Sequence, residues 1–351
     1  MTLRDELKSA IINLGNQPMA FEEIALEIFK YQYHLNPVYK QYVDSLKKDT
    51  KKIDRIEKIP FLPIEFFKTH RVLNQNAESQ LVFESSGTTS QNTSQHHISD
   101  LTLYELLSKK TFEQFYGPLT DYHIFALLPS YLERNNSSLV YMVQNFLYYS
   151  YSTQGGFFLD NLPKMFSKIR EAAESDRKIL LLGVSFALLD VAENENFSNI
   201  LKNISSKLTV METGGMKGRR KELIREELHS VLTNAFGVNE IHSEYGMTEL
   251  LSQGYSKGNG IFELPATMKI LLREINDPFT YLPSFAIGDQ NQTVKYRGKT
   301  GGINVIDLAN IDSCSFIETK DLGSFTEDYS KFSVMGRFDH SDVRGCNLLV
   351  S

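Results

Sequence analysis

The first eighty residues carry apolar side chains at helical spacing. One helical face collects Phe21, Ile24, Ala25, Ile28 and Phe29. Farther on, Asn36 followed by Pro37 predicts a new helix start, because asparagine caps helices well and proline fits the first helical position. The pattern therefore predicts a helical N-terminal segment over residues 1–80.

From residue 81 onward, short apolar runs alternate with amphipathic helices. We expect one helix to run from a Ser99 cap to Phe115 and to end at Gly117. A later helix should end at Gly237. Further helices are predicted at 139–147 and 162–173, and strands at 81–83, 124–128, 178–182, 207–212, 303–308 and 315–318. Such alternation predicts an α/β fold.

No clear linker divides most of the chain. We therefore expect one domain over residues 1–335, followed by a short C-terminal tail over 336–351. The longest apolar stretch, 179–192, is shorter than the roughly 20 residues that cross a bilayer. The first 14 residues lack the apolar run of a signal peptide. These features predict a cytoplasmic protein without a membrane span.

Composition and charge narrow the functional class. Of 351 residues, 41% are hydrophobic and 23% are charged, as in ordinary folded proteins. The 37 basic and 43 acidic residues leave a net charge of −6, which disfavours a nucleic-acid partner. Two cysteines, Cys314 and Cys346, are too few for a disulfide framework or a four-cysteine zinc site.

A hydroxyl-rich loop follows the first predicted strand. It reads ESSGTTSQ over residues 84–91. Short donors around a glycine suit phosphate oxygens, although the lysine and second glycine of a Walker loop are missing. An ordinary turn is the alternative interpretation.

A basic run follows the glycine pair Gly214 and Gly215. Lys217 and Arg219 belong to it, and a helix is predicted to follow. Cations are disfavoured at a helix N-terminus, so their clustering indicates a negative group nearby. A bound nucleotide or pyrophosphate is one candidate, and surface carboxylates are the other.

The segment HSEYGMTELLSQ, residues 242–253, combines three useful groups. The ring of Tyr245 can stack on a base, the hydroxyl of Thr248 can donate to a phosphate, and the carboxylate of Glu249 can hold Mg²⁺. The alternative is an ordinary loop leading into a helix.

The C-terminal region adds three candidates. Asp321 is suited to accept ribose hydroxyls, and Arg337 to donate to the sugar or to a phosphate. Cys346 lies five residues from the end of the sequence, where chains are often accessible, and a thiolate there can form a thioester. A lone cysteine can equally be an inert apolar residue.

In this order, the segments resemble the adenylate-forming enzymes, the superfamily of acyl-CoA synthetases and luciferases. A closer resemblance is to the acyl-protein synthetases of bacterial luminescence fatty-acid reductase complexes. It is carried by IPFLPIEFFKTH, GGMKGRRKEL, SEYGMTELLSQ and RGCNLL, and it covers residues 59–351. Phenylacetate-CoA ligases share part of the same pattern.

The resemblance implies both a fold and a reaction. The fold is that of the large N-terminal domain of adenylate-forming enzymes, without their full C-terminal domain. The implied enzyme is an acid–thiol ligase that uses ATP and Mg²⁺ to activate a carboxylic acid, expected to be a fatty acid, as its adenylate. The acyl group would then pass to Cys346 as a thioester.

The same resemblance assigns roles by motif. The phosphates of ATP would contact Ser85, Ser86, Gly87, Thr88, Thr89 and Ser90. Gly214 and Gly215 would flank the adenine, and Tyr245, followed by Gly246, would stack on it. Thr248 would contact the α-phosphate, and Glu249 would hold Mg²⁺. Asp321 and Arg337 would hold the ribose.

Two questions stay open at this level. The usual C-terminal lysine for adenylation is missing, and we expect Lys217 or Arg219 to replace it. The acceptor could instead be CoA or a carrier protein, or the chain could be a nucleotide-binding subunit without catalysis. Expected partners are a small carboxylic acid and an acyl-reductase, acyl-transferase or carrier protein.

Overall fold

The computed structural model describes residues 2–14, 20–85, 93–129, 136–214, 223–282, 298–326 and 330–338. Its helices are α1 (Leu3–Ile12), α2 (Phe21–Leu35), α3 (Pro37–Ser45), α4 (Phe66–Thr69), α5 (Leu101–Tyr116), α6 (Ser138–Ser150), α7 (Leu162–Ala173), α8 (Ser185–Ala192), α9 (Glu195–Asn203) and α10 (Arg225–Phe236). Short 3₁₀ turns are η1 (Thr50–Lys52), η2 (Ile56–Lys58), η3 (Leu119–Asp121), η4 (Ser205–Lys207) and η5 (Leu308–Asn310).

The strands follow the same order along the chain. They are β1 (Leu62–Pro63), β2 (Leu81–Glu84), β3 (Gln95–Ile98), β4 (Tyr122–Leu127), β5 (Gly156–Phe157), β6 (Lys178–Gly183), β7 (Leu208–Glu212), β8 (His242–Tyr245), β9 (Gly254–Ser256), β10 (Ile261–Glu263), β11 (Met268–Arg273), β12 (Gly301–Asp307), β13 (Phe316–Phe325) and β14 (Phe332–Arg337). The predicted α/β class is confirmed.

One large sheet has a parallel half and an antiparallel half. The strand order is β11-β12-β13-β14-β10-β9-β8-β7-β6-β4-β5, and β1 pairs with β13. Strands β5, β4, β6, β7 and β8 are parallel, whereas β8 to β11 pair in antiparallel fashion along this order. Strand β4 is buried along its whole length, as expected for a parallel strand with layers on both faces.

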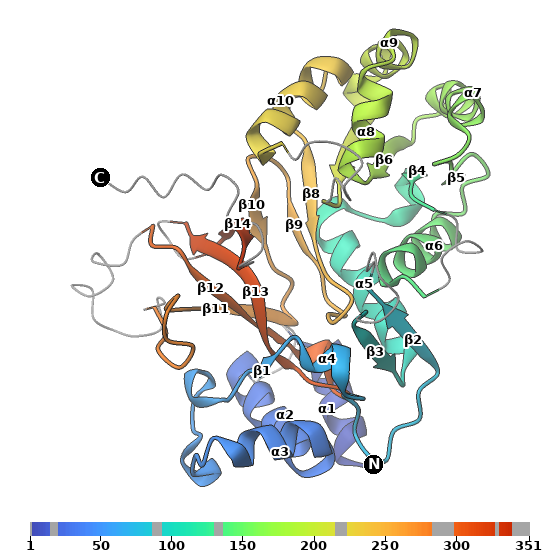
Figure 1. The fold of residues 1–351 in the computed structure, drawn as a ribbon. Coiled ribbons are helices and arrows are strands. Elements are labelled where there is room, and N and C mark those ends of the chain that lie inside the picture. Colours follow the sequence, from blue (N-terminus) through green and yellow to red (C-terminus); the bar gives the residue numbers. More distant parts are fainter. Residues whose placement is uncertain are drawn as a thin grey trace, which may run out of the picture.

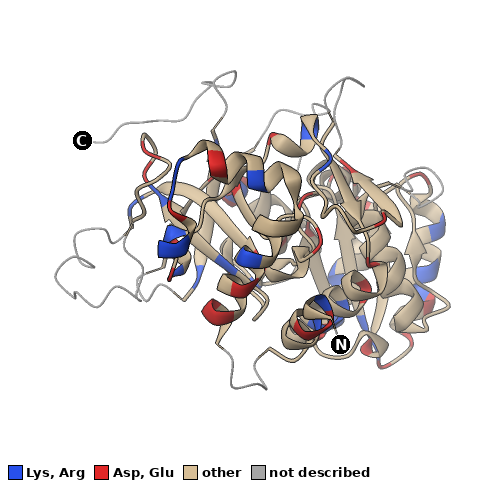
Figure 2. Cartoon of the chain, turned by 90° about the horizontal axis from the view of Figure 1, so that it is seen from below, with Lys and Arg blue, Asp and Glu red and all other residues tan. Residues whose placement is uncertain are grey.

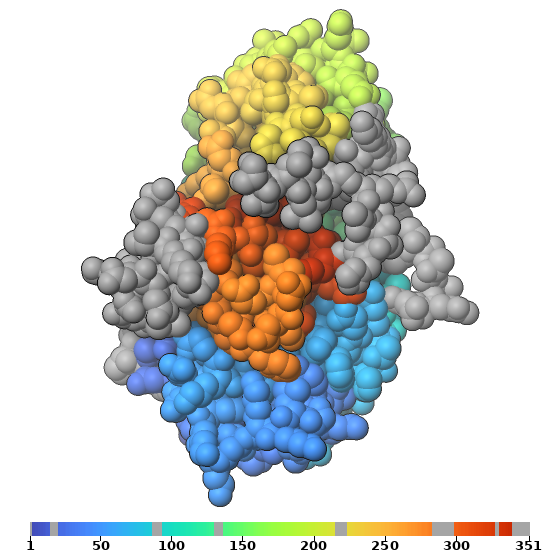
Figure 3. All heavy atoms as spheres, turned by 60° about the vertical axis from the view of Figure 1, so that its left-hand side comes forward, coloured from blue at the N-terminus to red at the C-terminus, as the bar shows by residue number. Residues whose placement is uncertain are grey.

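The N-terminal helices pack against the antiparallel half. The ring of Phe316 on β13 lies 6.3 Å from that of Phe29 and 6.1 Å from that of Tyr39. Gln32 Nε2 on α2 donates to the carbonyl of Asn310 at 2.9 Å. In Figure 1 these helices lie below the C-terminal strands, and Figure 3 shows those strands (orange to red) between α1–α3 (blue) and α10 (yellow).

Local capping signals were mostly confirmed. The side chain of Asn36 accepts from the backbone N–H groups of Val38 at 3.1 Å and Tyr39 at 3.0 Å. Gly117 and Gly237 follow α5 and α10 with φ of 86° and 68°, conformations that favour glycine.

The predicted Ser99 cap of α5 is wrong by one residue. Asp100 caps this helix by accepting from Leu103 N–H at 3.0 Å. The Ser99 hydroxyl donates instead to Asp312 at 2.7 Å, a residue that lies far away in the sequence. Serine and aspartate are both good caps, so only the tertiary contact decides between them.

The distribution of charge and the character of the helices complete the description. Basic and acidic residues are interspersed over the elements drawn in Figure 2. Within the described ranges, no helix combines the length and the apolar character that crossing a membrane requires.

Candidate active site

The candidate site lies where two neighbouring parallel strands end. Strands β7 and β8 pair with Met211 opposite His242 and Glu212 opposite Ser243. Their carboxyl ends therefore lie side by side, and the chain continues into Gly214 after β7 and into Gly246 after β8. In open α/β sheets, ligands bind beyond such strand ends.

Three predicted residues meet beside this edge. The hydroxyl of Tyr245 donates to Asp321 Oδ2 at 3.0 Å, and Arg337 Nε lies 3.2 Å from Asp321 Oδ1. Asp321 on β13 and Arg337 on β14 are register partners across the sheet. Pairing of the C-terminal strands therefore brings a carboxylate and a guanidinium to the tyrosine.

Burial raises the pKa of Asp321, whereas the charge of Arg337 and the hydrogen bond from Tyr245 oppose that shift. A carboxyl group that has lost water gains from each further hydroxyl donor it can bind. The two hydroxyls of a ribose are donors of this kind, and Arg337 is exposed enough to reach a ligand. The geometry thus suits the predicted sugar contact.

Tyr245 itself is more enclosed than its predicted stacking role suggests. It is 7% exposed. Phe262 and Phe332 contact it edge to face, at centroid distances of 5.9 Å and 5.5 Å. Any adenine would therefore meet only a narrow part of this ring, and stacking stays a prediction.

The base of the hydroxyl-rich loop lies beside Glu249. The N–H of Ser85 donates to the carbonyl of Ser94 at 3.1 Å, and the N–H of Ser94 donates to Ser85 Oγ at 2.9 Å. Ser94 also hydrogen-bonds to the carboxyl group of Glu249. The first residue of the predicted phosphate loop and the predicted metal ligand are therefore linked through one serine.

Glu249, the predicted Mg²⁺ ligand, is a buried carboxyl group. It is 5% exposed, and burial raises its pKa against the hydrogen bond from Ser94 and the charges of Arg337 and Lys68. In the part of the chain that the structure covers, no group of three acidic, histidine or cysteine residues could hold a metal. Mg²⁺ needs only one or two carboxylates when phosphates and water complete its shell, so Glu249 fits.

His96 supports Thr248 and was not expected to do so. Its Nδ1 hydrogen-bonds to the carbonyl of Thr248 at 2.9 Å, and its Nε2 lies 2.8 Å from Ser313 Oγ. Burial lowers the pKa of His96 to about 4, so the ring is neutral at pH 7. A neutral ring that donates to a carbonyl through Nδ1 accepts from serine through Nε2. These partners are 152 and 217 residues away in sequence, which hid the contact from sequence reasoning.

A buried acid and amide hold the turn after β8. Asp307 accepts from the N–H groups of Leu251 and Ser252, both at 2.8 Å. Asn310 donates to the carbonyl of Glu249 at 2.8 Å. This turn leads into strand β9. The alternative interpretation of the sequence, an ordinary loop leading into a helix, is therefore wrong about the element that follows. Thr248 and Glu249 are therefore held by a network from β12 and η5.

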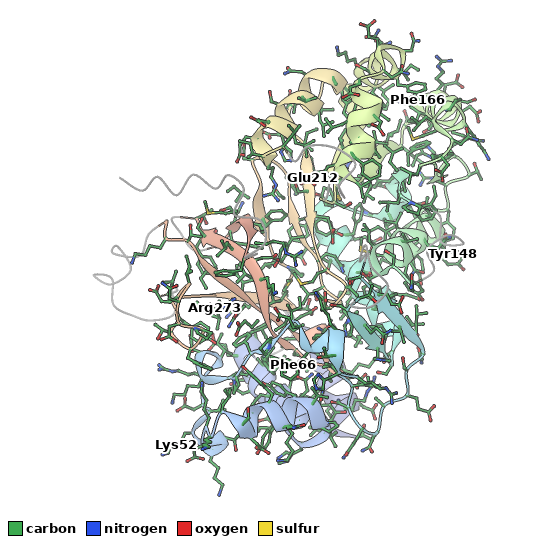
Figure 4. The ribbon with its side chains drawn as sticks, in the orientation of Figure 1. Lys52, Phe66, Tyr148, Phe166, Glu212 and Arg273 are labelled. Atoms are coloured by element: carbon green, nitrogen blue, oxygen red, sulfur yellow. The ribbon has the colours of Figure 1, made fainter. Side chains whose placement is uncertain are left out.

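Glu212 is the last residue of β7, and its side chain holds the backbone that follows this strand. Figure 4 labels this residue. Its Oε2 accepts from the N–H of Gly214 at 2.6 Å, while Arg225 Nε and His229 Nε2 lie 3.6 Å and 3.7 Å from its Oε1. Burial works against ionisation, but these neighbours and Ser243 hold the pKa of Glu212 below its usual range. Gly214 has φ 75°, and no described atom lies within 4 Å of where its side chain would be.

Several predicted residues cannot be placed. Helix α10 begins at Arg225, after the basic run. The residues outside the described ranges are Ser86, Gly87, Thr88, Thr89, Ser90, Gly215, Lys217, Arg219 and Cys346. Their assigned roles stay predictions.

The chain's other cysteine has a structural role. Cys314 is fully buried, and its Sγ donates to the carbonyl of Phe316 at 3.4 Å. Burial raises the pKa of this thiol to about 12. A protonated, inaccessible thiol is a poor nucleophile.

A cavity of about 200 Å³ opens between the two strand ends and the start of α6. Gly214, Gly246 and Thr248 form part of its wall, and Glu244 reaches into it. Burial and then the charge of Glu212 raise the pKa of Glu244 to about 8. Sequence reasoning missed Glu244 because it treated the segment around this residue as a loop, and nothing in the sequence shows that Glu244 would be buried near Glu212.

We expect Glu244→Gln to change stability in a pH-dependent way. The folded-state pKa of Glu244 lies above its unfolded value, so this carboxyl destabilises the fold as pH rises from about 4.5 to about 8. Relative to the parent, the variant should therefore gain stability over this range by up to about 1.4 kcal/mol per pH unit. Urea unfolding at several pH values measures this. A difference that stays constant with pH would contradict the assignment.

Comparisons with known proteins bear on the family and the fold. The family model described as "Acyl-protein synthetase, LuxE" matches residues 12–351. A structure of 2-hydroxyisobutyryl-CoA ligase in the postadenylation state superposes with a TM-score of 0.60 at 12% identity, covering 91% of this chain and 68% of that one. In its thioesterification state the same ligase gives a TM-score of 0.61 at 12% identity, covering 97% and 70%. These likenesses show the fold. No curated protein matches in sequence.

Proposed function

The chain belongs to the acyl-protein synthetase (LuxE) family and is an AMP-forming ligase, and on this premise we propose that it passes the acyl group of its adenylate to its own Cys346. The observation that supports the adenylation step is the meeting of Tyr245, Asp321 and Arg337 beside the ends of β7 and β8. Glu249 and the base of the hydroxyl-rich loop lie at the same edge. The burial of Cys314, the other cysteine of the sequence, favours Cys346 as the acceptor.

In the first half-reaction, a carboxylate oxygen of the acid attacks the α-phosphorus of ATP. The bond from that phosphorus to the bridging oxygen breaks, and pyrophosphate leaves. Asp321 and Arg337 orient the nucleotide through its ribose, and Thr248 donates to the α-phosphate. The residues of the hydroxyl-rich loop hold the outer phosphates. Positioning and charge neutralisation are the main contributions a protein makes to such displacements.

Glu249 is the residue that would hold Mg²⁺. When bound, the ion neutralises phosphate charge and helps pyrophosphate leave. The desolvated carboxyl group of Glu249 gains from a cation, and Ser94 fixes its orientation. We expect EDTA to stop acid-dependent release of pyrophosphate and added Mg²⁺ to restore it.

In the second half-reaction, a thiolate attacks the acyl carbonyl carbon. The carbon–oxygen bond to AMP breaks, the thiol proton passes to solvent, and a thioester results. Of the two cysteines in the sequence, Cys314 is buried in the core, which leaves Cys346 as the thiol available for this step. The thioester would then serve an acyl-reductase, acyl-transferase or carrier protein.

The cation that assists adenylation is assigned to the basic run. We expect Lys217→Ala or Arg219→Ala to lower the rate of acid-dependent pyrophosphate release by roughly 10- to 100-fold, as for loss of one group that stabilises transition-state charge. Lys68→Ala is the matched comparison, because Lys68 on α4 is a described cation whose charge acts on Glu249. Full activity in both variants of the basic run, with loss only in Lys68→Ala, would move the role to Lys68.

A further inference from the structure

The N-terminal helices hold the β12–β13 connection. This connection spans residues 308–315 and contains η5. On α1, Arg4 donates to both carboxylate oxygens of Asp312, from Nε at 2.8 Å and from Nη2 at 2.5 Å. On α2, Gln32 donates to the carbonyl of Asn310 at 2.9 Å. These partners are 308 and 278 residues apart in sequence, so the start of the chain fixes a segment near its other end.

The same connection also holds the backbone at Thr248 and Glu249. Asn310 Nδ2 donates to the carbonyl of Glu249 at 2.8 Å. The hydroxyl of Ser313 donates to His96 Nε2 at 2.8 Å, and His96 Nδ1 donates to the carbonyl of Thr248 at 2.9 Å. The side chains that make these contacts are all buried. A buried hydrogen bond resists displacement, because separating its partners leaves polar groups without water.

The pair formed by Arg4 and Asp312 has a defined geometry. Two N–H donors of one guanidinium meet the two oxygens of one carboxylate, which fixes the direction of the contact as well as its distance. Asp312 is 7% exposed, and it accepts in addition from the Ser99 hydroxyl at 2.7 Å. Without the guanidinium, this buried carboxylate would gain by moving toward water. Asn310 and Ser313 lie within two residues of Asp312, so they would move with it.

Lys8 provides a comparison one turn farther along α1. Its Nζ donates to Asp100 Oδ2 at 2.5 Å, and Arg4 Nη2 donates to the same oxygen at 3.0 Å. Asp100 is the cap of α5 and does not belong to the β12–β13 connection. The hydrogen bonds of Lys8 thus dock α1 on α5, whereas those of Arg4 also join α1 to Asp312.

We infer that Arg4 is a positioning residue for adenylation: by holding Asp312, it fixes the β12–β13 connection and through it the backbone at Thr248 and Glu249. The inference rests on the proposed function, in which Thr248 contacts the α-phosphate and Glu249 holds Mg²⁺. Such groups need to be held within about 0.5 Å of their working positions. All of α1 except its last residue precedes the range that the family model matches, so family membership alone does not imply this role.

The test compares Arg4→Met with Lys8→Met in acid-dependent pyrophosphate release by the full chain. Methionine keeps an apolar stem and removes the charged donors. For Arg4→Met we expect kcat to fall about 10-fold, because small displacements of catalytic groups are costly. The Mg²⁺ concentration that gives half the maximal rate should rise about three- to tenfold, as for loss of a residue that orients a metal ligand. The Lys8→Met chain should stay within about threefold of the parent in both quantities.

The Mg²⁺ response separates positioning from stability. A smaller folded fraction lowers the rate alike at every Mg²⁺ concentration and leaves the half-saturating concentration unchanged. A second check is the double variant Arg4→Met with Asp312→Asn. Because both substitutions break one contact, the double variant should lose little more kcat than Arg4→Met alone.

Two results would overturn the inference. One is an Arg4→Met chain with the kcat and Mg²⁺ response of the parent. The other is an equal loss of kcat in Arg4→Met and Lys8→Met with an unchanged Mg²⁺ response, which would show that α1 serves stability alone. Should Arg4→Met not fold, Arg4→Lys carries the same test with about a threefold expected change, since lysine keeps the charge but not the fork of donors. A parent chain that releases no pyrophosphate would count against the proposed function itself.

Discussion

Replacing Cys346 with serine should remove the acyl-protein adduct that forms when the parent is incubated with Mg-ATP and its acid. A serine hydroxyl is a much weaker nucleophile than a thiolate, so we expect adduct formation to fall by at least about 100-fold. Intact mass spectrometry measures the adduct, and its loss on treatment with hydroxylamine identifies a thioester. The mass increment also identifies the acid.

Cys314→Ala is the matched control for this experiment. Cys314 is buried, and burial holds its pKa far above neutral, so its removal should leave the adduct in place. An adduct of equal size and rate on the Cys346→Ser chain would show that another group accepts the acyl chain. If both chains convert ATP to AMP and neither carries an adduct, the acceptor is CoA or a carrier protein.

Asp321→Asn should lower kcat/KM for ATP by about 10- to 100-fold in acid-dependent pyrophosphate release. Hydrogen bonds to a charged group contribute about 1.5–3 kcal/mol, and asparagine keeps the shape of aspartate without its charge. The amide oxygen of the variant can still accept from the Tyr245 hydroxyl, so the fold should persist. The ion pair to Arg337 at 3.2 Å would be lost.

Glu318→Gln controls for a change of charge on the same strand. Glu318 lies three residues before Asp321 on β13, with its Oε1 3.6 Å from Arg273 Nη2, and is not part of the candidate site. We expect its kcat/KM to stay within about threefold of the parent. An Asp321→Asn chain with unchanged kcat/KM for ATP would rule out the ribose assignment. Thermal unfolding of both variants separates a binding defect from a general loss of stability.

The order of motifs along the sequence was enough to select several residues of the candidate site. Tyr245, Asp321 and Arg337 were named from sequence, and the structure brings them together. The Asn36 cap was also predictable, since both of its acceptor contacts lie within three residues. Such features depend on neighbours along the chain or on a characteristic residue pattern.

The features that the sequence did not predict depend on contacts between segments that are distant in the chain. His96 supports Thr248 from 152 residues away, and Glu244 becomes notable only because Gly246, Gln253 and Glu212 surround it. The sequence predicted a strand only over residues 315–318, and the residues that follow it include the polar Lys320 and Asp321. Pairing with β12 and β14 carries strand β13 to Phe325. Tertiary partners override local preference at such positions.

The position of β14 has a consequence for how the protein is synthesised. It comes after every other described strand in sequence, yet it lies between β13 and β10 and joins the two parts of the sheet. Until residues 332–337 have left the ribosome, β10 and β13 each present an unpaired edge to the cell. The nascent chain is therefore most exposed to wrong strand pairing late in translation. Arg337, at the end of this strand, reaches Asp321 only once that pairing is complete.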